Sequence, residues 1–193
     1  PALLYGGAPC KALRHKFLMA QESECHDITS PDFPAEIEII PLHGHIFDMV
    51  GYRTPDDIVF LADCVSSAAT LEKYKIGYLY DVQAYLDTLD YVDTLTAKLF
   101  VPSHTEPTED IHELTEINRR SVLEVQDKIL SICVEPMNFE AILQRIFTDY
   151  ALTLNFEQYA LIGSTLRSYL SWLLDSGKLA VSFEDNMLLW KTV

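Results

Sequence analysis

The sequence predicts an α/β fold, in which strands alternate with helices along most of its 193 residues. Three short segments rich in Ile, Val, Leu and Phe have the composition of buried strands. Two longer segments place apolar residues at helical spacing. After residue 135 the predicted order becomes helix, helix and hairpin, which indicates a second and smaller unit.

The three predicted strands each end in a loop. AEIEII (residues 35–40) alternates before it becomes continuously apolar. DDIVFLAD (56–63) and AKLFVPSH (97–104) are apolar in the middle and have acidic or proline-containing ends. Loops at the ends of such strands are where the candidate chemistry lies.

The N-terminal stretch predicts a short strand at Leu3–Tyr5, followed by a helix in CKALRHKFLMA (10–20), where Leu13, Phe17 and Leu18 are spaced for one face. The chain begins with proline rather than methionine and enters at once into strand-like and helical sequence. We therefore expect it to be a fragment of a longer protein.

Two amphipathic helices are predicted, one as a crossover before the third strand and one after it. Thr108 is the expected N-cap of the second helix, which spans 109–133. The apolar positions are Val82, Tyr85, Leu86, Leu89, Val92 and Leu95 in the first helix, and Ile111, Leu114, Ile117, Val122, Val125 and Ile129 in the second.

A boundary near residue 136 divides the chain into predicted units of 1–135 and 136–193. In the second unit, Asn138 and Asn155 are the expected caps of two helices. KLAVSFEDNMLLW then has the pattern of two strands around a turn at 184–186. This order resembles a small winged helix.

The composition argues against several classes of partner. A net charge of −15 disfavours nucleic acid, and the candidate recognition helix of the second unit offers only Arg167. No apolar segment approaches the roughly 20 residues of a membrane span, and no secretory signal is present. We expect a cytoplasmic protein. Its four cysteines form no CxxC pair and are expected to be reduced thiols.

Each predicted strand is followed or ended by a residue that can bind a metal: His43 and His45 after the first, Asp63 in the second and His104 in the third. Ligands of α/β sheets gather at the carboxyl ends of strands, so these side chains can meet at one edge. Imidazole and carboxylate suit zinc, iron or manganese, and a bound ion can activate water for hydrolysis. On these patterns alone, the alternative is that the loop histidines are structural.

The segments GHIFDMVGY, FLADC and VPSHTEP, in this order, resemble the C-terminal half of the metallo-β-lactamase superfamily. The resemblance implies that His45 is a metal-binding histidine, that Asp63 bridges two ions, and that His104 is the last histidine ligand. Asp48 and Met49 stand where the family usually has Gly and His. The implied fold is half of a metallo-β-lactamase αβ/βα sandwich, followed by a small winged-helix-like α+β domain.

The superfamily's HxHxDH motif, which supplies most of its protein ligands, is absent from this sequence, and neither His15 nor His26 has the right neighbours. Two interpretations follow: the chain is a fragment that begins just after that motif, which we favour, or the protein has lost catalysis. In either case we expect weak or no metal binding by this chain alone, because neither coordination shell can be completed.

The resemblance implies that the complete protein is a metal-dependent hydrolase acting on a small-molecule ester, thioester, amide or phosphoester. Two divalent ions are expected, zinc first and iron or manganese as alternatives. His45 and His104 would hold one ion each, with Asp63 as the catalytic, bridging carboxylate. A redox variant using iron stays open, as does a homodimer. The alternative function is a non-catalytic, degenerate domain that acts through dimerisation.

Other polar residues have structural interpretations. We expect His43 to stabilise its loop, His112 to be solvated, Cys64 to be buried and Asp48 to form a turn. The pair Ser66–Ser67 is expected to cap the following segment.

Overall fold

The structure is a computed structural model that describes residues 2–14, 19 and 23–193. Its elements in chain order are α1 (Ala2–Tyr5), the 3-10 helix η1 (Lys11–Leu13), β1 (Glu38–Pro41), β2 (Val50–Arg53), β3 (Ile58–Ser66), α2 (Ala68–Tyr74), α3 (Val82–Asp93), β4 (Leu99–His104), α4 (His112–Ile132), α5 (Phe139–Asp149), α6 (Phe156–Asp175), β5 (Leu179–Glu184) and β6 (Met187–Thr192).

The first four strands form one sheet in the order β1-β2-β3-β4. β1, β2 and β3 are antiparallel neighbours, whereas β3 and β4 are parallel and are joined through α2 and α3, because parallel neighbours need a crossover. β1, β3 and β4 confirm the three predicted strands. β2 was not predicted, because its four residues include Gly51 and follow directly on the histidine loop. A Cβ at Gly51 would lie 2.2 Å from the carbonyl oxygen of Phe60.

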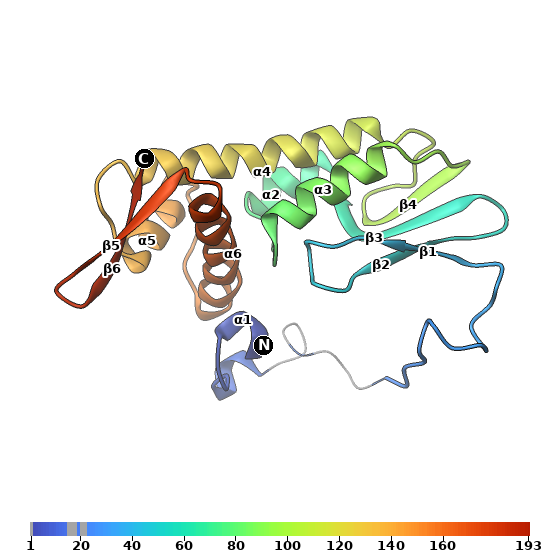
Figure 1. Cartoon of the computed structure of the whole chain (residues 1–193), viewed down its shortest axis with the longest axis horizontal. Coiled ribbons are helices and arrows are strands. Elements are labelled where there is room, and N and C mark those ends of the chain that lie inside the picture. Colours follow the sequence, from blue (N-terminus) through green and yellow to red (C-terminus); the bar gives the residue numbers. More distant parts are fainter. Residues whose placement is uncertain (1, 15–18, 20–22) are drawn as a thin grey trace.

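Helices cover one side of this sheet (Figure 1). Val59 and Leu61 of β3 are fully buried in the core on alternate positions, as expected where one face of a sheet packs against helices. The alternate residues form a cross-strand row on the other face: Ile39, Tyr52, Phe60 and Val101. Tyr52 stacks on Phe60 with ring centroids 4.9 Å apart, yet it keeps 42% of its surface exposed.

The long helix α4 connects the sheet to the C-terminal elements (Figure 1), since it contacts α3 and β3 as well as α5 and β6. The helix was predicted, but Thr108 is not its N-cap. The backbone of Thr108 pairs with Phe100 in both directions, at 2.8 and 2.9 Å. Instead, the carboxylate of Asp110 accepts the N–H of His112 at 3.0 Å. Pairing with β4 therefore keeps Thr108 in an extended segment before the helix.

The C-terminal elements follow the predicted order of helix, helix and hairpin. Asn138 and Asn155 cap α5 and α6 as expected, each accepting a hydrogen bond from the backbone N–H three residues later. β5 and β6 join at Asp185 and Asn186, both with positive φ, which suits a two-residue hairpin turn.

The core is continuous across the predicted boundary near residue 136. Buried side chains of the sheet, α3 and α4 belong to the same cluster as those of α5 and α6. A backbone bridge between Met137 and Trp190 ties the start of the C-terminal elements to their last strand. The division into two units therefore stays a prediction about sequence organisation, while the packing joins them.

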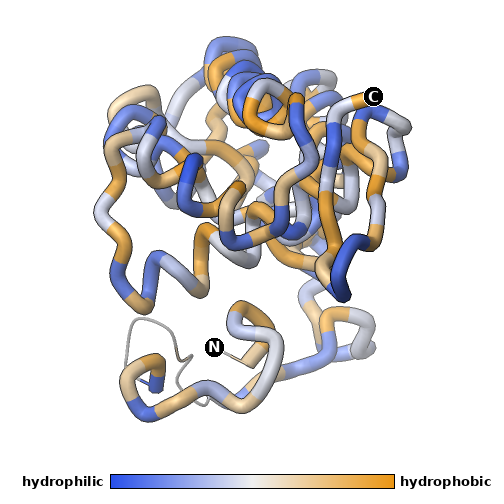
Figure 2. The backbone as a smooth tube through the Cα atoms, turned by 90° about the vertical axis from the view of Figure 1, so that its left-hand side faces the viewer, coloured by the Kyte–Doolittle hydropathy of each residue, from blue (hydrophilic) through white to orange (hydrophobic). Residues whose placement is uncertain are grey.

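The strand predicted at Leu3–Tyr5 is wrong, because these residues form the short helix α1, which lies against α6. The ring of Tyr5 meets Phe156 edge-on with centroids 6.1 Å apart. Of the helix predicted over 10–20, the structure shows only η1, and Phe17 and Leu18 lie outside the described residues. Figure 2 shows the N-terminal elements at the edge of the main body. No helix of the described part of the chain is long and apolar enough to cross a membrane.

Candidate metal centre

The structure brings His45, Asp63 and His104 together. His45 Nε2 lies 3.5 Å from Asp63 Oδ2, and His104 Nε2 lies 3.3 Å from Asp63 Oδ1. The side chains are 27%, 38% and 53% exposed in that order, so the site opens to solvent at the edge of the sheet. Their role as metal ligands remains a prediction.

An irregularity in β3 precedes Asp63. The register between β3 and β4 shifts on both sides of Ala62, whose φ is 46°. A residue with a Cβ pays about 1–2 kcal/mol in this left-handed region. Bulges of this kind bend a strand and redirect the side chains beside them, often next to functional sites.

His104 is placed by the end of β4, where it pairs with Ser66 of β3. Its carbonyl oxygen faces the N–H of Ser67 at 3.5 Å and the hydroxyl of Thr70 at 3.4 Å. Ser66 is itself held by the buried amide of Asn118, which accepts from the Ser66 N–H at 3.1 Å and donates to the Ser66 carbonyl at 2.8 Å. Helix α4 thereby fixes the end of β3, against which His104 of β4 is paired.

His45 is placed by a close crossing of its loop over the start of α3. Gly44 has a φ of +110°, and a Cβ there would lie 2.2 Å from the backbone nitrogen of Tyr85. The Gly44 carbonyl accepts N–H bonds from Tyr80 at 2.9 Å and Asp81 at 3.0 Å. Only glycine combines this conformation with this close approach, so the residue before His45 is fixed by packing.

The His45 ring is oriented by Tyr78 as well as by Asp63. Burial lowers the pKa of His45 below its ordinary value, although the Asp63 carboxylate and a hydrogen bond with the Tyr78 backbone both act to raise it. Nε2 of the ring lies toward Asp63, on which the second imidazole also converges. The Tyr78 ring also meets His45 edge-on, with centroids 5.5 Å apart. A neutral ring with Nε2 free is the form that ligates metals.

The donor set can be compared with the dimensions of a zinc site. Tetrahedral zinc with ligand bonds of about 2.0–2.2 Å keeps neighbouring donor atoms about 3.4 Å apart, and the two imidazole–carboxylate pairs span 3.5 and 3.3 Å. Each carboxylate oxygen has one imidazole. Over residues 2–14, 19 and 23–193, no group of three or more His, Cys, Asp or Glu that could hold a metal ion is found. If Asp63 bridged two ions, this chain would supply two donors to each of them.

The other histidines have structural partners. His43 Nδ1 lies 2.7 Å from the Phe47 carbonyl, which closes the loop around His45 and confirms the predicted stabilising role. The expectation for His112 was incomplete: its ring is exposed, but Nδ1 lies 2.7 Å from Asp93 Oδ1. Sequence spacing could not show that pair, because its members come from different helices.

Two further expectations are confirmed, and a third is confirmed in part. Cys64 is buried, and its burial raises the pKa of its thiol to about 12, so it is not a reactive thiolate. Ser67 caps α2 by accepting the N–H of Thr70 at 3.2 Å, but Ser66 is not part of the cap, because it is the last residue of β3 and its backbone is bonded to Asn118. Asp48 is exposed and lies in a turn.

The sequence patterns missed the residues that support the site, notably Gly44, Tyr78 and Asn118. The first two lie in loops with no periodicity. Asn118 could have been found from the sequence, because it is a polar residue on the same helix face as the buried Thr115, Val122 and Val125. A polar side chain on the buried face of a helix must find partners inside the protein.

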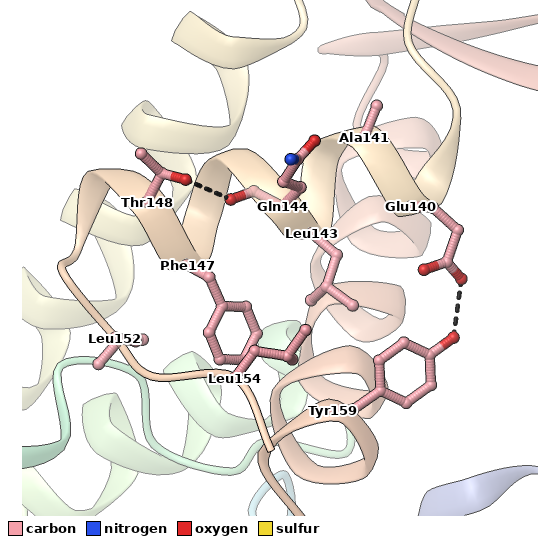
Figure 3. A pocket seen from close by; sticks show the side chains of 9 residues that line it. All are labelled: Glu140, Ala141, Leu143, Gln144, Phe147, Thr148, Leu152, Leu154 and Tyr159. Carbon is pink, nitrogen blue, oxygen red and sulfur yellow. Dashed lines mark hydrogen bonds between the residues drawn. The ribbon is translucent and has the colours of Figure 1, made fainter. Parts of the chain in front are cut away.

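Two cavities in the described part of the chain are lined by none of the candidate ligands His45, Asp63 and His104. One, of about 590 Å³, lies beside α5 and is mainly apolar, with Leu143, Phe147 and Leu154 in its wall (Figure 3). At one end the Tyr159 hydroxyl donates to Glu140 at 2.8 Å. The other, of about 660 Å³, lies between α1, the start of α3 and α6. The candidate metal centre thus lies in the open near the carboxyl ends of β3 and β4, and not in one of these cavities.

Known proteins resemble the chain in fold. No protein-family model and no curated protein sequence matches it. Among solved structures, a β-lactamase domain protein from Burkholderia ambifaria has a TM-score of 0.70 at 15% identity, over 90% of this chain and 52% of that one. A metallo-β-lactamase family protein from Thermus thermophilus has a TM-score of 0.64 at 11% identity, over 81% of this chain and 49% of that one.

These comparisons confirm the predicted fold class. The chain is a mixed α/β protein with the fold of metallo-β-lactamase family proteins, and it spans about half the length of the two structures. Identities this low establish the fold alone. The reaction, the ligands and the role of the C-terminal elements therefore belong to the proposal that follows.

Proposed function

We propose that the complete protein is a metal-dependent hydrolase in which this chain supplies one ligand to each of two divalent ions and a carboxylate shared by both. His45 would hold one ion, His104 the other, and Asp63 would bridge them. The observation that carries the proposal is the placement of one imidazole Nε2 against each oxygen of Asp63, at donor spacings that suit zinc.

The ions would supply Lewis acidity and a water that is deprotonated near neutral pH. The residues of this chain position the ligands. Asp63 holds the two imidazoles on either side of one carboxylate, while Tyr78 orients His45 from behind. The half-exposed edge leaves room for a water and for the carbonyl or phosphoryl group of a small substrate. The net charge of −15 disfavours polyanionic substrates such as nucleic acid.

The remaining ligands would come from residues that precede this chain in the complete protein. The two similar structures are about twice as long as the part that matches, which leaves length for such residues. With two donors per ion, the chain alone would bind zinc weakly. The C-terminal elements, a winged-helix-like extension in this proposal, would cover the main domain.

A second candidate function is a non-catalytic domain that associates with another copy of itself. The observation that favours it is the row of Ile39, Tyr52, Phe60 and Val101 on the sheet face opposite the helices, since Tyr52 keeps 42% of its surface exposed. A contiguous apolar face of this kind can serve as an interface.

The test is the metal content and hydrolytic activity of the complete protein with and without Asp63→Ala. We expect about two ions per chain before the substitution, and a loss of bound metal together with a fall of more than about 100-fold in hydrolysis of chromogenic esters after it. Asp93→Ala is a matched control, because Asp93 also contacts an imidazole, that of His112, but only one. It should leave both quantities unchanged.

Unchanged metal occupancy after Asp63→Ala would remove Asp63 from the site. A complete protein that binds no metal, yet sediments as a dimer, would instead favour the association function.

A further inference from the structure

Helix α6 is hydrogen-bonded to the loop between α2 and α3. Thr165 is 1% exposed, and its hydroxyl oxygen accepts the N–H of Leu79 at 3.3 Å. One turn further along the helix, the Ser168 hydroxyl donates to the Tyr80 carbonyl at 2.8 Å. Two consecutive residues of this loop are therefore tied to one helix that follows more than 80 residues later in the chain.

The same loop holds the loop of His45. Tyr80 donates its N–H to the carbonyls of Gly44 and His45, at 2.9 and 3.2 Å. Tyr78 contributes its backbone to the His45 ring and its own ring to the edge contact. The residues that α6 binds are thus the direct neighbours of those that orient His45.

The loop of residues 75–81 lies between α2 and α3. It begins at Lys75, which ends α2 with a φ of 61°, and it has no strand partner within the described part of the chain. The contact with α6 continues into the first turn of α3, where Trp172 Nε1 donates to Gln83 Oε1 at 2.9 Å. The loop is therefore held between α6 on one side and the His45 loop on the other.

We infer that α6 is a positioning element for His45, and that Thr165 and Ser168 are the positioning residues. They hold residues 78–80, which set the direction of the His45 ring toward Asp63. The inference rests on the proposed function for its consequence in metal binding, but the positioning itself concerns only residues of this chain. Groups that orient a ligating histidine from behind typically change metal affinity about 10–100-fold when they are removed.

The experiment compares Thr165→Val with Thr115→Val in the complete protein, because this chain alone is expected to bind zinc weakly. Thr115 is a matched control, since it is 2% exposed and also loses a buried hydroxyl, but its hydroxyl bonds to Asp93 and not to the 78–80 loop. Thr165→Ser keeps the oxygen and should restore the original behaviour. Ser168→Ala is a milder variant of the same contact, in case Thr165→Val does not fold.

Three quantities are measured: hydrogen exchange of the Leu79 amide, the imidazole nitrogen shifts of His45 in metal-free protein, and zinc affinity by competition with a chelator. We expect Thr165→Val to speed Leu79 exchange, to move the His45 shifts while those of His104 stay in place, and to weaken zinc binding about tenfold. Thr115→Val should lower the unfolding temperature without moving the His45 shifts.

The positioning of His45 and the binding of zinc can be tested separately. His45 shifts that do not move in Thr165→Val and Ser168→Ala would overturn the positioning role, whatever the protein binds. His45 shifts that move, in a protein that binds zinc in none of its forms, would support the positioning role and count against the proposed function.

Discussion

Asp63 reaches both histidines because of the backbone around it. Ala62 adopts a positive φ and shifts the register of β3 just before the carboxylate. On the other side of the site, Gly44 permits the His45 loop to cross Tyr85 at a distance that no other residue allows. At the scale of single residues, the site therefore depends on two backbone conformations as much as on its ligands.

The identities of the three candidate ligands could be predicted from the sequence, whereas their support could not. His45, Asp63 and His104 stand at the ends of recognisable strands, where α/β sheets gather ligands. The positive φ of Ala62 has no counterpart in the sequence, because alanine usually avoids that region. The edge-on contact of Tyr78 with His45 joins two loops, and residue type alone does not predict it.

His112 and Asp93 make a pH-dependent contact between α3 and α4. The hydrogen bond that the His112 ring donates to the Asp93 carboxylate raises the pKa of His112. The pKa of Asp93 is lowered by the hydrogen bonds that it accepts from Thr115 and then from His112. A group whose pKa is raised by folding stabilises the protein at pH values below its pKa in the unfolded chain, which is about 6.5 for histidine. This contribution is lost as the pH rises through the pKa of the group in the folded protein.

We therefore expect His112→Gln to lower stability relative to the unmodified chain at about pH 5.5 and to have little effect at about pH 8.5. Urea unfolding at the two pH values measures the difference, and other titrating groups cancel in the comparison. Asp93→Asn should remove the same pH-dependent difference. An effect of His112→Gln that is equal at both pH values would contradict the ion-pair account.

At the scale of elements, the sequence patterns located β1, β3 and β4 and all the long helices, because each has a clear apolar period or an asparagine cap. They missed β2, whose VGYR sequence is short and contains glycine, and α2, whose seven residues are too few to show a period. They also assigned α1 to a strand. Short elements take their structure from neighbours, as α1 does from α6.

Asn118 is the link between α4 and the end of β3. Its oxygen accepts from the Ser66 N–H and from the Tyr85 hydroxyl at 3.3 Å, and its nitrogen donates to the carbonyls of Ser66 and Leu114, both at 2.8 Å. Asn118→Leu would leave these buried groups without a partner, at a cost of about 2–4 kcal/mol in the free energy of unfolding.

Denaturant titration measures this loss. Gln126→Leu is the control, since it removes a nearly buried amide from the same helix, but its partners are the side chains of Asp127 and Lys178. It should cost about 1 kcal/mol or less. Equal losses for the two variants would show that Asn118 has no special role at the strand end.

At the scale of the whole molecule, one core joins the sheet to the C-terminal elements, and α4 and α6 both cross between them. The sequence indicated two units from the change in element order, which is a local property. It could not show that α6 returns to the 78–80 loop, because that contact depends on tertiary packing between distant segments. The C-terminal helix α6 therefore contacts the loop that holds His45 in place.

The claim that His45, Asp63 and His104 act as one ligand set is tested most directly by a cobalt(II) titration of the isotope-labelled chain, followed at the imidazole signals of its six histidines. The measurement tolerates weak binding. We predict that the His45 and His104 signals broaden together at the lowest cobalt concentrations, before those of His26 and His112, and that Asp63→Ala abolishes this joint response. Broadening that starts at other histidines, or that persists unchanged in Asp63→Ala, would contradict the account.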